Sequence, residues 1–225
     1  MKQSGHFKLG TDSVLLGNFA STPSARRGID LGCCTGVLSI LLLARHPHLH
    51  MTGLEIDSDA AAVARENMHI NGFDSRSEIV VGDIRNANRD FQSGSFDVVI
   101  SNPPYFQLSA GSVSPDIRRA QARGEVSCTL EELIKAAKHL CRWDGKVFLV
   151  HKPERLVELL SLMSANGIEP KRLRFVAHSQ DFQPSLVLIE GRRGGNPGLA
   201  VDPVLYIKDS DGDDTEEIKK IYHRN

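Results

Sequence analysis

Short apolar runs alternate with longer segments that carry the apolar spacing and end signals of helices. The runs predict buried strands over 28–31, 51–56, 78–81, 96–101 and 146–151. The segments between and after them predict helices over about 35–46, 58–70, 129–141 and 153–166. Because strands and helices alternate at the spacing of βαβ units, the pattern predicts an α/β protein with a mostly parallel sheet covered on both faces.

Both ends of the chain depart from this alternation. A short helix over about 11–20, with Thr11 or Asp12 as its cap, is predicted before the first strand. Two late strands, 172–177 and 185–190, are separated by too few residues for a helix and should pair as an antiparallel hairpin. The sequence predicts one domain over 1–225, with 11–20 as a cap helix and 191–225 as a surface tail.

Composition excludes several classes of protein. The 225 residues include 27 Lys and Arg against 28 Asp and Glu, so a uniformly basic nucleic-acid binder is excluded. Apolar runs are far shorter than the about 20 residues that span a bilayer, and no signal peptide is recognisable, so no membrane partner is expected. The four cysteines form no Cys-x-x-Cys pair, which predicts reduced thiols in a cytoplasmic protein.

Acidic and glycine residues gather where the first three predicted strands end. Asp30 begins a turn that contains Gly32 and Gly36 and leads directly into a helix, whose free N–H groups can bind an anion. Glu55 ends the next strand, where a carboxylate can accept both hydroxyls of a ribose. Asp83 follows the third strand and can accept from the amine of adenine. Three such features in order predict an adenosine-containing ligand at this edge of the sheet.

The turn excludes two common nucleotide sites. Gly36 is followed by Val37 rather than the Lys-Ser/Thr pair of a Walker loop, and the Gly-x-Gly-x-x-Gly fingerprint of dinucleotide sites is absent. The turn resembles the Asp-x-Gly-x-Gly-x-Gly motif of class I S-adenosylmethionine-dependent methyltransferases, with Cys34 in place of the middle glycine. Cys34 should narrow the space beside the methionine part of the cofactor.

That resemblance implies a Rossmann-like, doubly wound sheet, mostly parallel with an antiparallel terminal strand. It also implies S-adenosylmethionine as cofactor, with S-adenosylhomocysteine as the product left behind. The predicted cofactor residues are Asp30, Gly32, Cys34, Gly36, Glu55, Ile56, Asp83, Ile84 and Asn102.

The tetrapeptide Asn102-Pro103-Pro104-Tyr105 after the fourth strand is the most specific signal in the chain. The side-chain oxygen of Asn102 and the carbonyl of Pro103 can accept both hydrogens of an –NH2 group, which orients its nitrogen. The prolines fix the backbone, and Tyr105 offers a face for stacking. The motif resembles that of methyltransferases acting on planar nitrogen, whose substrates are adenine N6 or the glutamine side-chain amide. The tetrapeptide alone does not separate these substrates.

Further segments resemble the tRNA1(Val) (adenine-37-N6)-methyltransferase family over nearly the whole chain. They are 7–12, 122–125, 151–156, 169–176 and 194–199. The resemblance implies an enzyme that transfers a methyl group to N6 of adenine in tRNA, at position 37 of the anticodon loop. Two alternatives stay open: a protein glutamine N5-methyltransferase, and a catalytically silent module that binds cofactor or RNA.

Basic residues form local clusters that could contact tRNA phosphates. An ordinary solvated surface explains them equally well. The predicted substrate-binding residues are Lys8, Phe106, Arg118, Arg119, Arg123, Lys171, Arg172 and Arg174. Neither a metal site, despite the alternating His46, His48 and His50, nor an obligatory protein partner is expected.

Overall fold

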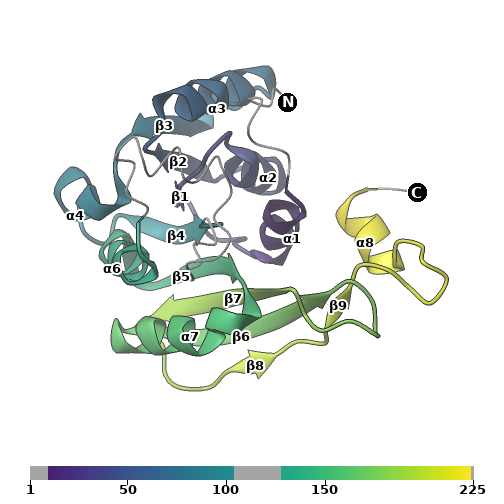
Figure 1. Ribbon diagram of the computed structural model, residues 1–225. Coiled ribbons are helices and arrows are strands. Elements are labelled where there is room, and N and C mark those ends of the chain that lie inside the picture. Colours follow the sequence, from purple (N-terminus) through teal and green to yellow (C-terminus); the bar gives the residue numbers. More distant parts are fainter. Residues whose placement is uncertain (1–9, 104–127, 224–225) are drawn as a thin grey trace, which may run out of the picture.

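The strands form one sheet that continues across the whole molecule. The structure is a computed structural model that describes residues 10–103 and 128–223. Within these residues the strand order is β3-β2-β1-β4-β5-β7-β6-β8, and β9 also pairs with β6 (Figure 1). The strands are β1 Arg27–Leu31, β2 His50–Glu55, β3 Ser77–Val81, β4 Phe96–Ser101, β5 Cys141–His151, β6 Ile168–Ala177, β7 Leu186–Arg193, β8 Ala200–Val201 and β9 Leu205–Tyr206.

Strand directions agree with the predicted topology. Strands β1 to β5 pair in parallel, whereas β7 runs antiparallel to both β5 and β6. The predicted hairpin is therefore confirmed, with β7 placed between β5 and β6. Because β1 to β5 are parallel, their carboxyl ends meet at one edge of the sheet, where the sequence placed its site residues.

Helices cover both faces of the sheet, which gives three layers (Figure 1). The longer ones are α1 Thr11–Phe19, α2 Val37–Arg45, α3 Ser58–Ile70, α6 Leu130–Leu140 and α7 Leu156–Ala165, and the short ones are α4 Ala87–Asp90, α8 Glu216–Ile221, η1 Asp74–Arg76, η2 Ile84–Asn86 and η3 Pro153–Arg155. One core cluster joins the sheet to α1, α2, α3 and α8. The other joins it to α4, α6 and α7.

Two strands begin several residues earlier than the sequence predicts. Strand β5 begins at Cys141 rather than 146, and β6 begins at Ile168 rather than 172. In both cases the register of strand pairing shifts and breaks the apolar alternation. The pairing of β5 with β4 shifts between Phe96 and Val98 of β4, and the pairing of β6 with β7 shifts between Pro170 and Arg172 of β6. A proline is tolerated in a strand at such a bulge, so Pro170 does not end β6.

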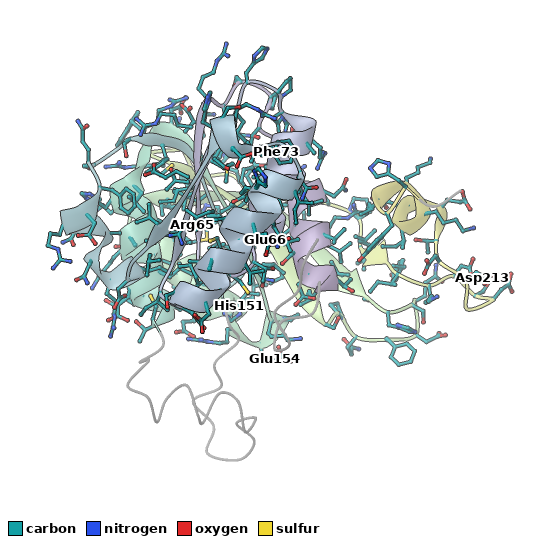
Figure 2. All side chains as sticks on the ribbon, turned by 90° about the horizontal axis from the view of Figure 1, so that it is seen from above. Arg65, Glu66, Phe73, His151, Glu154 and Asp213 are labelled. Atoms are coloured by element: carbon teal, nitrogen blue, oxygen red, sulfur yellow. The ribbon has the colours of Figure 1, made fainter. Side chains whose placement is uncertain are left out.

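The predicted surface tail over 191–225 is wrong in part. Residues 191–193 continue β7, and β8 and β9 pair with β6. Leu205 and Ile218 are buried in the core cluster that α1 and α2 also join. The sequence hides this because the two apolar anchors are far apart within an acidic segment. Asp213 marks the part of the tail that extends away from the sheet (Figure 2).

Helix α1 is fixed to the body of the protein by its second half. Arg45 of α2 donates to the Gly17 carbonyl at 2.6 Å, and Arg172 of β6 donates to the Phe19 carbonyl at 2.6 Å. The Phe19 ring meets Phe148 edge-on, with 6.4 Å between centroids. The predicted capping is wrong, because Gly10 is the N-cap and makes no side-chain cap bond.

None of the helices in the described ranges is long and apolar enough to cross a bilayer.

Candidate active site

The turn after β1 holds its shape through backbone bonds to the neighbouring strand. Gly32 and Gly36 have φ of +73° and +82°, values that glycine adopts at no steric cost. The N–H groups of Gly32 and Cys33 both donate to the Leu54 carbonyl, at 2.9 and 3.2 Å. Gly36 is the N-cap of α2, and no side-chain cap bond is made there by the described residues. The turn therefore places a helix N-terminus at the carboxyl edge of the sheet.

Glu55 connects this turn to the end of β2. Its side chain is 9% exposed, with Oε2 accepting from the Cys34 N–H at 2.8 Å and Oε1 from the Asp57 N–H at 3.0 Å. Asp57 in turn caps α3. An ionised carboxylate accepts about four hydrogen bonds, so each oxygen of Glu55 keeps a further lone pair for a ligand. The predicted contact to a ribose fits this geometry and stays a prediction.

Asp30 lies fully buried at the end of β1. The hydroxyl of Ser39 in α2 donates to Oδ2 at 3.2 Å, while the buried Oδ1 has no hydrogen-bond partner in the described part of the chain. Burial raises the pKa of Asp30 to about 7, and the nearby Glu55 charge adds to this effect. A cationic group placed beside Oδ1 would satisfy this oxygen and favour the ionised carboxylate.

Asp83 is held in its charged form at the end of β3. The Arg85 side chain binds both carboxylate oxygens, and the Arg85 N–H donates to Oδ1 at 2.9 Å. The hydrogen bonds from Arg85 lower the pKa of Asp83. Ile84 is half-buried, and Ile56 beyond β2 is 48% exposed, so an apolar surface remains open at this edge. The predicted contacts to an adenine ring stay predictions.

Asn102 leaves β4 at the same edge, beside the turn of β1. Ser101 fixes this junction, because its buried hydroxyl donates to the Leu31 carbonyl at 2.7 Å. The side-chain amide of Asn102 donates through Nδ2 to the Ser13 hydroxyl of α1 at 3.0 Å. Pro103 is half-buried and is the last described residue before 128. Seven other residues predicted for the acceptor site lie outside the described residues, namely Pro104, Tyr105, Phe106, Lys8, Arg118, Arg119 and Arg123.

The cysteines of the turn are poor nucleophiles. Burial raises the pKa of the Cys34 thiol to about 11, and the Glu55 charge raises it further in the same direction. Burial also raises the pKa of Cys33 well above its ordinary value. Both are free thiols that stay protonated at neutral pH. Cys34 has φ of +49°, so it occupies a backbone conformation that favours glycine.

The basic residues of β6 contact other parts of the chain itself. Arg172 stacks on the Phe19 ring at 3.9 Å and pairs with Glu190 at 3.3 Å. Arg174 forms a forked pair with Glu217 of α8, and Lys171 donates to the Asn196 carbonyl at 3.0 Å. Lys171 and Arg174 therefore bind the tail segment, whereas Arg172 joins β6 to α1 and β7. Their predicted contacts to phosphate stay predictions.

Several residues that shape the site carry little signal in the sequence. Ser13, Ser39 and Ser101 act through contacts between distant segments, which no local pattern reveals. Gly53 offers a signal, because it interrupts an apolar strand. A Cβ at Gly53 would lie 2.7 Å from the Cys33 Sγ, so only glycine lets the turn pack on β2.

Sequence comparison places the chain among known proteins. A family described as "Methyltransferase small domain" matches residues 5–164. The chain belongs to this methyltransferase family. A relative from Porphyromonas gingivalis, named tRNA1(Val) (adenine(37)-N6)-methyltransferase, is 34% identical over 82% of this chain and 74% of its own length. One of the same name from Tolumonas auensis is 33% identical over 91% of this chain and 83% of its own.

Solved structures agree on the fold of this methyltransferase. A predicted O-methyltransferase from Agrobacterium tumefaciens superposes with a TM-score of 0.77 at 17% identity, covering 95% of this chain and 96% of its own. Geranyl diphosphate C-methyltransferase from Streptomyces coelicolor, in complex with S-adenosylhomocysteine, superposes with a TM-score of 0.59 at 13% identity. The superposition covers 80% of this chain and 76% of that one. The predicted class I methyltransferase fold is confirmed, with its mostly parallel sheet and antiparallel strand.

Proposed function

We propose that this methyltransferase transfers a methyl group from S-adenosylmethionine to N6 of adenine in tRNA. The observation that carries the proposal is the placement of Asn102 and Pro103 at the carboxyl end of β4, directly beside the turn that ends β1. The acceptor residues and the predicted cofactor residues thus share one edge of the sheet. The family match and the printed names of the relatives support the same reaction.

The residues at this edge fit the cofactor. Asp30 offers the ammonium group a buried oxygen that has no partner among the described residues, and Glu55 keeps lone pairs for the ribose hydroxyls. The charged Asp83 can accept from the adenine amine, with Ile84 and Ile56 against the ring. Gly32 lets the backbone approach the cofactor closely, whereas Gly36 makes room for Met68 of α3, and Cys34 narrows the space beside the methionine part. When bound, S-adenosylmethionine supplies the electrophilic methyl group.

Asn102 and Pro103 hold the acceptor. The Oδ1 of Asn102 and the carbonyl oxygen of Pro103 accept the two hydrogens of the target amine. The nitrogen lone pair is then free to face the methyl group, which is catalysis by orientation and electrostatic assistance. In the sequence, Pro104 adds no competing N–H donor, and Tyr105 supplies a stacking face for the base. These roles rest on the motif as well as on the position of Asn102.

Adenine in a tRNA anticodon loop suits such a site. A base in a loop is already single-stranded, so turning it into the pocket costs little. The names of the relatives favour position 37, and a tRNA-modifying enzyme would act in the cytoplasm. The predicted phosphate contacts are Lys8, Arg118, Arg119, Arg123, Lys171, Arg172 and Arg174, with Phe106 near the base.

Methyl transfer from labelled cofactor tests the proposal. The protein is offered unmodified tRNA and, separately, a release-factor protein, and products are identified by mass analysis of nucleosides and peptides. We expect N6-methyladenine in tRNA. Asn102→Ala should lower the transfer rate by roughly 10²-fold or more with cofactor affinity nearly unchanged. Methylated glutamine without N6-methyladenine would contradict the assignment of tRNA adenine as the substrate. The absence of transfer to either substrate would contradict the assignment of methyl transfer as the activity.

A further inference from the structure

The contact between α1 and Asn102 assigns a role to a residue outside the recognised motifs. We infer that Ser13 is a positioning residue, whose hydroxyl accepts from Asn102 Nδ2 and thereby fixes the side-chain oxygen toward the acceptor amine. The inference rests on the proposed function, because it takes Asn102 as the residue that holds the amine. It extends that function to a residue of α1, far from the tetrapeptide in sequence.

The chemistry of the amide explains why one of its ends must be fixed. An asparagine amide is planar, with a donor on one branch and an acceptor on the other. The Nδ2 branch points at the Ser13 hydroxyl, at 3.0 Å, so Oδ1 occupies the opposite branch. If the amide turned over, its –NH2 group would oppose the hydrogens of the target amine, and two donors would face each other. The bond to Ser13 holds one branch of the amide in place, and in the observed direction, from Nδ2 to Oγ, it leaves Oδ1 on the branch that accepts from the target amine.

Helix α1 is a rigid support for this contact. Its second half is held by Arg45 at the Gly17 carbonyl, by Arg172 at the Phe19 carbonyl and by the buried Leu15 and Leu16. The position of residue 13 therefore does not depend on its own hydroxyl. Alanine also forms helices better than serine, so Ser13→Ala should leave α1 folded. A loss of activity in this variant would then report the lost hydrogen bond.

A double-mutant cycle separates positioning from a general structural effect. Transfer rates with saturating cofactor and tRNA are measured for wild type, Ser13→Ala, Asn102→Ala and the double variant. We expect Ser13→Ala to lower kcat by roughly tenfold in the wild-type background and less than about twofold when residue 102 is alanine, because the two residues act as one unit. Cofactor affinity should not change, and Ser13→Thr should restore the rate by keeping a hydroxyl.

A matched control comes from the same helix. Asn18 is exposed on α1 and Asn18→Ala should leave kcat at the wild-type value. Equal losses from Ser13→Ala in both backgrounds, or no loss in either, would overturn the positioning role.

A spectroscopic measurement keeps the inference testable if tRNA is not the substrate. The side-chain amide signals of Asn102 are identified by their disappearance in Asn102→Asp and followed by NMR in the cofactor-bound protein. We expect Ser13→Ala to shift this pair of signals and Ser13→Thr to leave it near its wild-type position. An unchanged pair in Ser13→Ala would overturn the inference, whereas wild-type protein that fails to methylate tRNA would overturn only the proposed function.

Discussion

Cys34 stands in the turn after β1, where its φ of +49° favours glycine. A side chain in this conformation costs about 1–3 kcal/mol, and glycine recovers part of it. Cys34→Gly should therefore raise the free energy of unfolding by about 1 kcal/mol. It should also keep or increase cofactor affinity, since it widens the space beside the turn. Denaturant unfolding and calorimetry measure the two effects. Loss of methyl transfer in a folded Cys34→Gly variant would show that the thiol has a role beyond packing.

Asp30 should make stability depend on pH near neutrality. Its pKa rises from 3.8 to about 7 on folding, so between these values the folded protein binds more protons than the unfolded chain. Stability from this group is therefore highest at low pH and falls as the pH rises toward 7. Relative to Asp30→Asn, wild type should lose roughly 2–3 kcal/mol of unfolding free energy between pH 5 and 8.

The difference between the two proteins is the quantity to measure, because the titrating groups far from Asp30 are shared and cancel. Urea unfolding at several pH values in the absence of cofactor provides it. A constant difference between wild type and Asp30→Asn across this range would mean that Asp30 is already ionised in the folded protein.

Residues of the site differ in how far the sequence reveals them. The position of Asp30, Glu55 and Asn102 at one edge of the sheet could be predicted, because each ends or follows an apolar run and parallel strands bring such ends together, while their roles stay predictions. The contact between Ser13 and Asn102 could not, since it depends on how α1 packs against α2 and β5. Local patterns identify which residues reach the edge, and only packing shows which of them touch.

At the scale of the element, β2 depends on the missing side chain of Gly53. An added methyl group would lie 2.7 Å from Cys33 Sγ and 2.8 Å from Ile79 Cδ1, and both neighbours are buried. Gly53→Ala should therefore destabilise the fold by about 1–3 kcal/mol through overpacking. A displacement of Cys33 would also move the turn after β1, so the affinity for the cofactor should fall.

Gly72→Ala provides a comparison, since its Cβ would meet no atom of the described residues within 4 Å and its cost comes from a φ of +72°. Gly72→Ala should lower stability without changing cofactor affinity. Equal affinity losses in the two variants would show that the packing of β2 against the turn does not control the site. Calorimetry with S-adenosylhomocysteine makes the comparison.

Element boundaries were predictable where the apolar period is clean. Helix α3 matches its predicted range because Asp57 caps its start and Gly72, with φ of +72°, follows its end. Strands β5 and β6 were predicted too short, because bulges shift their register and break the alternation. The sequence thus locates a regular element well and misses the irregular pairs that extend it.

At the scale of the whole molecule, the late hairpin and the strands of the tail extend the sheet beyond β5. The pairing of β7 with β6 followed from the short connection between the two late strands, whereas the pairing of β7 with β5 did not. The docking of the tail did not, because it depends on Leu205, Ile218 and the pair between Arg174 and Glu217. Those contacts also use basic residues that the sequence alone assigns to phosphate.

The basic residues should therefore divide into two groups with different effects. Arg172 stacks on Phe19, pairs with Glu190 and donates to the Phe19 carbonyl, so Arg172→Ala should lower stability by about 1–3 kcal/mol.

Arg118, Arg119 and Arg123 lie outside the described residues, and the sequence predicts that they contact tRNA. Replacing all three by alanine should weaken tRNA binding and reduce the slope of log affinity against log salt by about 0.7–0.9 per lost phosphate contact. Binding titrations at several salt concentrations measure this slope, with cofactor affinity as the internal control. A slope equal to that of wild type would place the tRNA on another face of the molecule.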